Sequence, residues 1–121
     1  MYGAKFGTGT YTFANRDRYD GSFYFNQSDG KGRMAYSNGD IYDGDWKLGS
    51  YDGKGKFSWS NGGVYEGDYS EGRREGQGKY LFQNKSWFSG TWKNGVQHGE
   101  GVFHEGFDEI KGTWEEGELL S

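Results

Sequence analysis

The most informative absence from this chain is that of a conventional aliphatic core. Its 121 residues include no cysteine and no proline, and only 31% are hydrophobic, most of them aromatic. The lack of cysteine excludes a disulfide scaffold and thiolate metal sites. So few aliphatic side chains cannot build a compact core, and low hydrophobicity by itself is typical of disordered chains.

The aromatic residues argue against disorder. The chain has 10 Tyr, 9 Phe and 5 Trp, which together make 20% of it, whereas disordered chains are poor in aromatics. Each ring can bury about 150–250 Å² of surface. We therefore expect one ordered domain in which aromatic rings take the place of aliphatic side chains.

Two further absences narrow the function. The formal net charge of −4 disfavours nucleic acid as a partner and does not attract anionic membranes. No apolar run is long enough to span a bilayer, and no signal-peptide pattern follows Met1. We expect a cytoplasmic or cytoskeletal protein.

What is present is a repeat of 23 residues, marked by glycines and aromatics. Full copies cover 19–41, 42–64, 65–87 and the shorter 88–109, with half copies at 2–18 and 110–121. In the first half copy Gly3, Gly7 and Gly9 are in phase with Gly49, Gly53 and Gly55. A fixed period in the twenties predicts a stacked array whose units contact mainly their neighbours. Residues 1–121 are therefore interpreted as a single repeat array.

Each copy contains two alternating segments, which in the second copy are 42–47 and 54–59. Strict alternation predicts half-buried strands, joined here by a glycine-rich hairpin turn over 48–53. Folding about the centre of that turn places Trp46 opposite Gly55, with large rings lying across glycines. A ring over a bare glycine shields the backbone and offsets the weak strand propensity of glycine.

The second link of each copy has its own signal. A three-residue loop with a glycine bulge is predicted at Asn38-Gly39 and Asn61-Gly62, because this loop keeps the aromatic faces of consecutive strands on one side. Asn84-Lys85 lacks the glycine, so a looser turn or another type is expected there. The fourth copy loses its pattern over 104–109, which predicts an altered edge or an irregular connection.

The predicted fold is all-β: an elongated, single-layer antiparallel meander of about ten strands with an aromatic groove on one face. The candidate groove residues are Tyr19, Phe23, Tyr36, Tyr42, Trp46, Phe57, Trp59, Tyr65, Tyr69, Tyr80, Phe82, Phe88 and Trp92. A contiguous apolar stripe without a covering layer predicts a binding surface.

The pattern of Tyr42, Gly44, Trp46, Gly49, Gly53 and Gly55 resembles the MORN repeat, the membrane occupation and recognition nexus, over residues 2–117. The first copy departs from it at Phe23 and Asn26. The resemblance implies a twisted single-layer sheet and a scaffold role in cytoskeletal, ciliary or flagellar assemblies, with axoneme association included. It also leaves open a phosphoinositide-binding module, or an accessory module of a larger enzyme.

The residues give little sign of chemistry. The GxG pairs have no following helix, and His98 and His104 alone are too few ligands for zinc. The carboxylates follow the repeat on the polar face, as expected of a solvated ion-pair ladder. We expect no enzyme activity, no cofactor and no metal.

Two hypotheses about partners follow. In the first, a protein helix or extended peptide binds in the aromatic groove, and the sheet ends, with Tyr11, Phe13 and Trp114, could pair with another copy. In the second, a membrane lipid binds the basic stripe of Lys31, Arg33, Lys54, Lys56 and Lys79. Carboxylates interleave with that stripe, and self-neutralisation is therefore the favoured interpretation.

Overall fold

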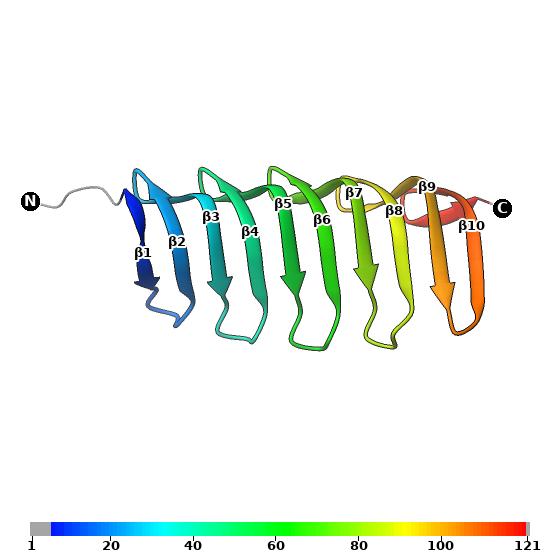
Figure 1. Cartoon of the computed structure of the whole chain (residues 1–121), viewed down its shortest axis with the longest axis horizontal. Coiled ribbons are helices and arrows are strands. Elements are labelled where there is room, and N and C mark those ends of the chain that lie inside the picture. Colours follow the sequence, from blue (N-terminus) through cyan, green and yellow to red (C-terminus); the bar gives the residue numbers. More distant parts are fainter. Residues whose placement is uncertain (1–5, 121) are drawn as a thin grey trace, which may run out of the picture.

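The protein is described by a computed structural model over residues 6–120, so positions 2–5 of the first half copy, Gly3 among them, and Ser121 lie outside the described residues. Eleven strands form one antiparallel sheet in sequential order, which confirms the all-β single-layer meander (Figure 1). The strands are β1 (Gly7–Thr12), β2 (Arg18–Tyr24), β3 (Gln27–Ala35), β4 (Ile41–Lys47), β5 (Ser50–Ser58), β6 (Val64–Ser70), β7 (Arg73–Leu81), β8 (Trp87–Lys93), β9 (Val96–Glu105), β10 (Asp108–Glu115) and β11 (Glu118–Leu120).

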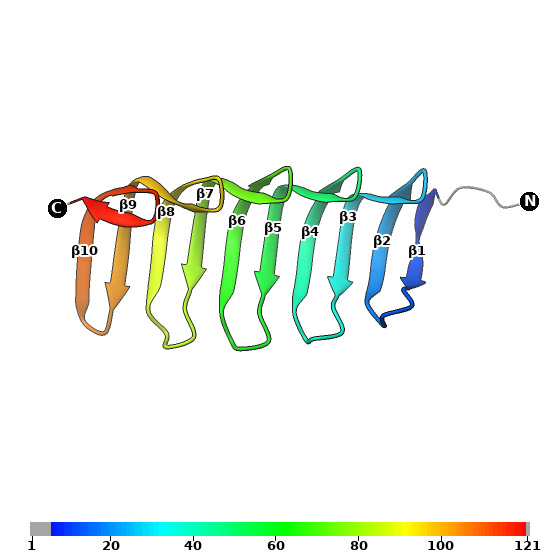
Figure 2. The same ribbon diagram turned by 180° about the vertical axis from the view of Figure 1, so that it is seen from behind.

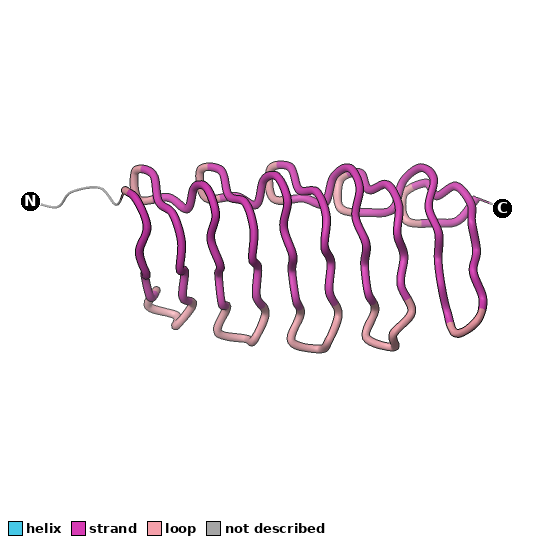
Figure 3. Tube along the Cα trace, viewed as in Figure 1, coloured by secondary structure: helices cyan, strands magenta, loops and turns pink. Residues whose placement is uncertain are grey.

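Turns of two kinds occupy the two long edges of the sheet (Figure 3). At the lower edge, Trp59 N–H donates to Gly63 O at 2.8 Å and Gly62 N–H donates to Trp59 O at 3.0 Å. Gly62 has φ of 101°, so this is the expected three-residue loop with a glycine bulge. The Asn61 side-chain oxygen accepts from Gly63 N–H at 3.0 Å and fixes the loop.

The prediction of a different turn at Asn84-Lys85 was wrong. Phe82 N–H donates to Ser86 O and Lys85 N–H donates to Phe82 O, as in the glycine-containing copies. Lys85 takes the left-handed conformation itself, with φ of 77°. The asparagine supplies the reason, because Asn84 Oδ1 accepts from Ser86 N–H at 2.9 Å and holds the loop without a glycine.

The turn predicted over 48–53 was too long. Lys47 pairs directly with Ser50, so the connection is only Leu48-Gly49, with φ of 47° and 83°. Positive φ at both central residues is the type I′ geometry, whose twist matches that of the flanking strands. Residues 50–53 therefore belong to β5 and carry Tyr51 into the sheet.

Over the long segments of the strands, the shorter turn and a bulge behind it together shift the register by two residues from the prediction. Gly44 lies opposite Gly55 and Tyr42 opposite Phe57, rather than ring opposite glycine. The faces are still as predicted, because a shift of two preserves alternation. The ring still covers glycine, but from a diagonal position: a Cβ built on Gly55 would lie 2.5 Å from Cε1 of Tyr42.

Every copy bends near its upper edge, so that the tight turns project from the plane of the long strand segments (Figures 1 and 2). Between the pairs Gly44–Gly55 and Trp46–Tyr51, β5 contains two more residues than β4. Gly53, with φ of 107°, lies in this bulge. Bulges bend a strand, and their repetition in every full copy folds the sheet into a long groove with a second, shorter wall.

The fourth copy differs where the sequence predicted an irregular connection. A two-residue turn, Gly106-Phe107, replaces the three-residue loop, and Asp108 pairs with Glu105. Gly106 has φ of 61° in the first turn position, as in a type II′ turn. The smaller loop accounts for the missing residue of this copy, and the pairing continues through it.

Candidate partner-binding groove

The concave side of the bent sheet carries the aromatic rings, and its floor is closed to solvent. Tyr19, Tyr42, Tyr65 and Phe88 occupy equivalent positions in successive copies and are all 0% exposed. Above the floor, Trp46, Tyr69 and Trp92 are buried as well. These predicted groove residues thus form the core of the protein and present little surface to a partner.

The floor tyrosines lock the bend in place. The Tyr42 hydroxyl crosses the facing glycines and donates to Asp45 O at 2.8 Å, and Tyr65 donates to Asp68 O at 2.9 Å. Burial raises the pKa of both hydroxyls. These rings therefore act as structural braces and not as acids or bases at neutral pH.

The tryptophans link neighbouring copies. The indole N–H of Trp46 donates to Gly32 O at 3.0 Å, and that of Trp92 donates to Gly78 O at 3.0 Å. The Trp46 ring also meets the edge of Tyr42 with a centroid separation of 5.0 Å. The indole N–H groups and the rings of these tryptophans therefore already have partners inside the fold.

A second set of rings remains half-buried and accessible along one wall of the groove. We call it the ring ladder, and it consists of Tyr36, Phe57, Trp59, Tyr80, Phe82 and Phe103. Successive centroids along it lie 6.2, 4.5, 5.2, 4.7 and 6.1 Å apart. The ladder therefore runs unbroken from the end of the first full copy into the fourth.

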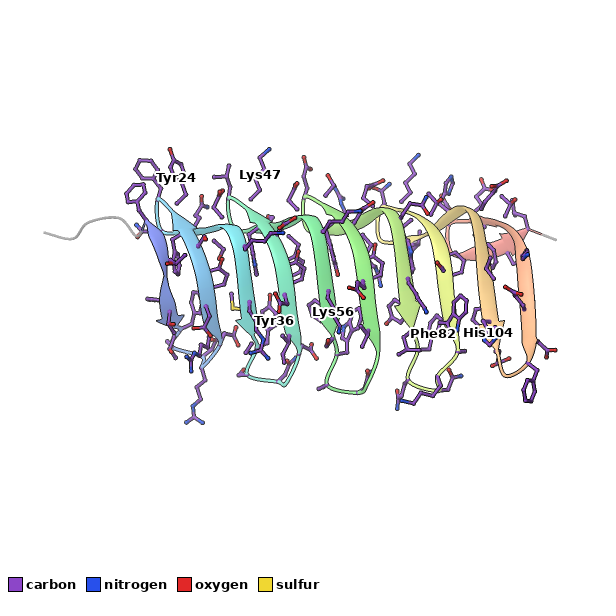
Figure 4. All side chains as sticks on the ribbon, in the orientation of Figure 1. Tyr24, Tyr36, Lys47, Lys56, Phe82 and His104 are labelled. Carbon is purple, nitrogen blue, oxygen red and sulfur yellow. The ribbon has the colours of Figure 1, made fainter. Side chains whose placement is uncertain are left out.

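The structure brings the predicted residues of this ladder together, and Phe103, which the alternation also places on this face, continues it. Phe23, the remaining predicted groove residue, is half-buried beside Tyr19, with centroids 5.0 Å apart, at the N-terminal end. Figure 4 shows Tyr36 and Phe82 near the three-residue turns of their copies, whereas Tyr24 and Lys47 lie along the opposite edge.

Two groove residues were missed from the sequence, Tyr51 and Arg74, which occupy equivalent positions on the shorter wall. Tyr51 stacks on Tyr42 at 3.9 Å, and its hydroxyl forms a short hydrogen bond with that of Tyr36. The Arg74 guanidinium lies 4.9 Å from the centroid of Trp92. Both fell in segments interpreted as turns, although an aromatic in the Tyr51 segment was visible in the sequence.

Tyr51 lines two pockets of the groove. One has a volume of about 440 Å³ and is lined by residues that include Phe13, Met34, Tyr36, Trp46 and Tyr51. The other, about 250 Å³, is lined by residues that include Tyr51, Phe57, Trp59, Tyr69 and Arg74. The groove is thus lined by rings and suited to a narrow ligand.

The outer face carries the five basic residues considered for lipid binding, and each has a carboxylate beside it. Lys31 pairs with Asp45, and Lys54 pairs with Asp68. The Lys31 hydrogen bond, followed by that from the backbone N–H of Lys54, lowers the pKa of Asp45. The stripe is therefore largely neutralised on this face.

The other three cations follow the same pattern. Arg33 lies opposite Asp20 and Asp43, and Lys56 lies opposite Asp43 and Glu66. Lys79 lies opposite Glu66, with its Nζ 4.4 Å from the ring centroid of Trp87. This arrangement leaves no run of uncompensated positive charge among the five.

His104 takes a structural place. His104 stacks on Trp87 with centroids 5.0 Å apart and an interplanar angle of 8°, on the outer face near the lower edge (Figure 4). Among residues 6–120 no group of three or more His, Cys, Asp or Glu side chains could hold a metal ion. Within the same residues no helix is long and apolar enough to cross a membrane.

Comparison with known families gives a match to the MORN repeat at residues 1–18, 19–41, 42–64, 65–87 and 88–104. The matches at 19–41, 42–64 and 65–87 have the same bounds as the copies seen in the sequence, the first begins one residue before the half copy, and the last ends one residue before the end of β9. No curated protein matches the chain.

Proposed function

The chain belongs to the MORN-repeat family, and on that basis we propose that it is a non-catalytic scaffold whose aromatic groove binds a segment of another protein. MORN repeats bind proteins or membranes and are generally non-catalytic. The cytoplasmic, cytoskeletal or ciliary setting expected from the sequence is part of this proposal.

The ring ladder is the observation that supports protein binding. Its six rings are already half-buried by their neighbours, yet no second layer of the described chain covers them. A contiguous apolar surface of this kind is typical of an interaction site, and Tyr and Trp are frequent anchors. The paired charges of the outer face make membrane lipid the weaker alternative.

The proposal is tested by comparing two tryptophans, because binding of a protein partner should depend on Trp59 and not on Trp87. Both tryptophans are half-buried, but Trp59 belongs to the ring ladder and Trp87 to the opposite face. We expect Trp59→Ala to lose proteins that the wild type recovers from a native lysate, while Trp87→Ala keeps them. Equal recovery by both variants would place binding elsewhere.

The buried rings are unsuitable for this test. Trp46, Tyr65 and Trp92 are at most 5% exposed, so alanine there would remove core packing as well as any contact with a partner. Circular dichroism on the Trp59 and Trp87 variants checks that each retains the strand signal.

A second candidate role, association of the sheet edges with another copy, is supported by exposure at the outer strands. Ile110 in β10 is 44% exposed, although Tyr42 at the equivalent position is fully buried. Tyr11 in β1 is 38% exposed. If the edges associate, Ile110→Lys should lower a concentration-dependent molar mass in light scattering, and a mass that never changes with concentration argues against it.

A further inference from the structure

The spacing of the ring ladder selects among ligand conformations. Phe57, Tyr80 and Phe103 occupy equivalent positions in successive copies, two strands apart. Neighbouring strands are about 4.8 Å apart, so a copy advances about 9.6 Å along the groove. A ligand lying along the groove meets equivalent rings with that period.

A polyproline II helix matches this period better than an α-helix does. It has three residues per turn and rises about 9.3 Å per turn, so every third residue presents the same face at nearly the ladder spacing. In an α-helix the nearest repeat is seven residues, about 10.5 Å, with a rotation of about 20° per heptad. Across two copies, the repeat of an α-helix is about 2 Å longer than the spacing of the rings, whereas that of a polyproline helix is shorter by less than about 1 Å.

The ladder also offers unused hydrogen-bond donors. Within residues 6–120, the indole N–H of Trp59 and the hydroxyl of Tyr80 have no hydrogen-bond partner, unlike the indoles of Trp46 and Trp92. No buried side-chain nitrogen or oxygen of the described residues lacks a partner, so both donors reach solvent. The backbone carbonyls of a polyproline helix make no internal hydrogen bonds and need such donors.

Negative charges at one end of the ladder favour one orientation of a bound segment. Asp17 and Asp40 accept hydrogen bonds from Ser37 N–H and Ser60 N–H, beside the N-terminal end of the ladder. Burial, together with the fields of these two carboxylates, raises the pKa of Tyr36. With a chain charge of −4, this end favours a cationic group.

We propose that the ring ladder binds a proline-rich segment in the polyproline II conformation, with proline at every third residue and a basic residue near Asp17 and Asp40. This inference rests on the proposed groove function and names the chemistry of its partner. Aromatic-lined grooves suit such segments because their conformation is pre-formed and little entropy is lost on binding.

The test uses synthetic peptides and the whole chain. The first peptide carries proline at every third position with an arginine at one end. The second has the same composition with the proline spacing scrambled, and the third is an amphipathic helical peptide of equal length. Binding is followed by amide chemical shifts and by titration calorimetry for the wild type, Trp59→Ala and Trp87→Ala.

We expect the phased peptide to bind, to lose at least about tenfold in affinity on scrambling, and to lose as much in Trp59→Ala but not in Trp87→Ala. Equal binding of phased and scrambled peptides, or none at about 1 mM, overturns the proposal. If the helical peptide alone binds through Trp59, the groove function stands and the polyproline assignment fails. If Trp59→Ala also recovers the same proteins from a lysate as the wild type does, the groove function fails too.

Discussion

At the scale of single residues, the fold depends on glycines that leave room for a ring. Gly44 and Gly55 face one another across β4 and β5, and the Tyr42 ring lies over both. A Cβ on Gly55 would overlap that ring, which is fully buried and cannot move away without losing its hydrogen bond to Asp45 O.

Gly55→Ala should therefore lower the free energy of unfolding by about 1–3 kcal/mol through overpacking. Gly9 is the matched control, since it holds the same place in the first half copy and a Cβ there would meet nothing within 4 Å. Gly9→Ala is expected within about 0.5 kcal/mol of the wild type in urea denaturation. Equal costs at the two positions would contradict the role given to the Tyr42 ring.

Lys85 is the opposite case, because it has a side chain at a position whose backbone conformation favours glycine. Its φ of 77° is left-handed, whereas the equivalent Gly62 has φ of 101° without a side chain to strain. We expect Lys85→Gly to stabilise the protein by about 1 kcal/mol, because the left-handed strain exceeds the entropy cost of glycine.

Thermal unfolding measures this effect, and the reciprocal Gly62→Lys should lower the midpoint. A drop in the midpoint for Lys85→Gly would mean that the Asn84 hydrogen bond alone does not hold the loop. The substitution leaves that bond, and the Phe82–Ser86 pair, in place.

At the scale of the elements, the bend in the second and third copies is fixed by a carboxylate. Asp45 Oδ2 accepts from Lys54 N–H at 3.0 Å at the bulge, and Asp68 accepts from Gln77 N–H in the next copy. The same Asp45 carboxylate pairs with Lys31 of the preceding copy. One side chain thus joins a local bend to an inter-copy contact.

Acid should weaken this element. The pKa of Asp45 is lowered below its usual 3.8, first by the Lys31 hydrogen bond and then by that of Lys54. A lowered folded-state pKa gives stability that is complete above the unfolded value and is lost as the pH falls through the folded value. The thermal midpoint should therefore fall as the pH drops below about 4.

Lys31→Met separates this effect from general acid unfolding. It removes the main cause of the lowered pKa, so the midpoint should depend less on pH over the same range while the bulge hydrogen bond remains. An identical pH dependence in wild type and variant would rule out the Lys31 pairing as a source of stability.

The face on which each strand residue lies could be predicted from the sequence, but the bend of the sheet could not. Alternation placed Tyr42, Phe57 and Trp59 on one side, and the loop at Asn61-Gly62 kept that parity. The two-residue turn at Leu48-Gly49 and the bulge behind it were hidden, because leucine is an unusual residue for φ of 47°. Their combined effect moved the register by two.

The same reason limited the candidate site. Without the bend, a flat sheet leaves all its rings open, and the sequence therefore could not separate Tyr65, which is fully buried, from Trp59, which is accessible. It also placed Tyr51 in a loop. Which ring is core and which is surface depends on the shorter wall, and that wall arises from backbone geometry rather than from side-chain pattern.

At the scale of the whole molecule, the contacts pass from each copy to the next. Gly49 N–H donates to Ser28 O, and Gly72 N–H donates to Tyr51 O, so these tight turns hydrogen-bond to the preceding copy. Side chains repeat the link, as Asp17 accepts from Ser37 N–H and Asp40 from Ser60 N–H. Strand contacts likewise occur between sequential neighbours.

Such an array should tolerate the loss of one whole copy. Deleting residues 42–64 joins Ile41 to Tyr65 in phase, so β3 can pair with β6 as it pairs with β4 in the intact chain. We expect a folded protein with a lower midpoint and a smaller urea m-value, because less surface is exposed on unfolding.

Deleting residues 42–53 is the informative contrast, because it removes β4 and the bent part of β5. The strand that follows then has to run in the opposite direction, and every later three-residue loop falls on the edge where a two-residue turn is needed. This variant should lose the strand signal in circular dichroism although it retains more residues than the first deletion. If both variants fold equally well, strand direction and the type of turn at each edge do not determine the fold. The array would then be held together by ring packing alone.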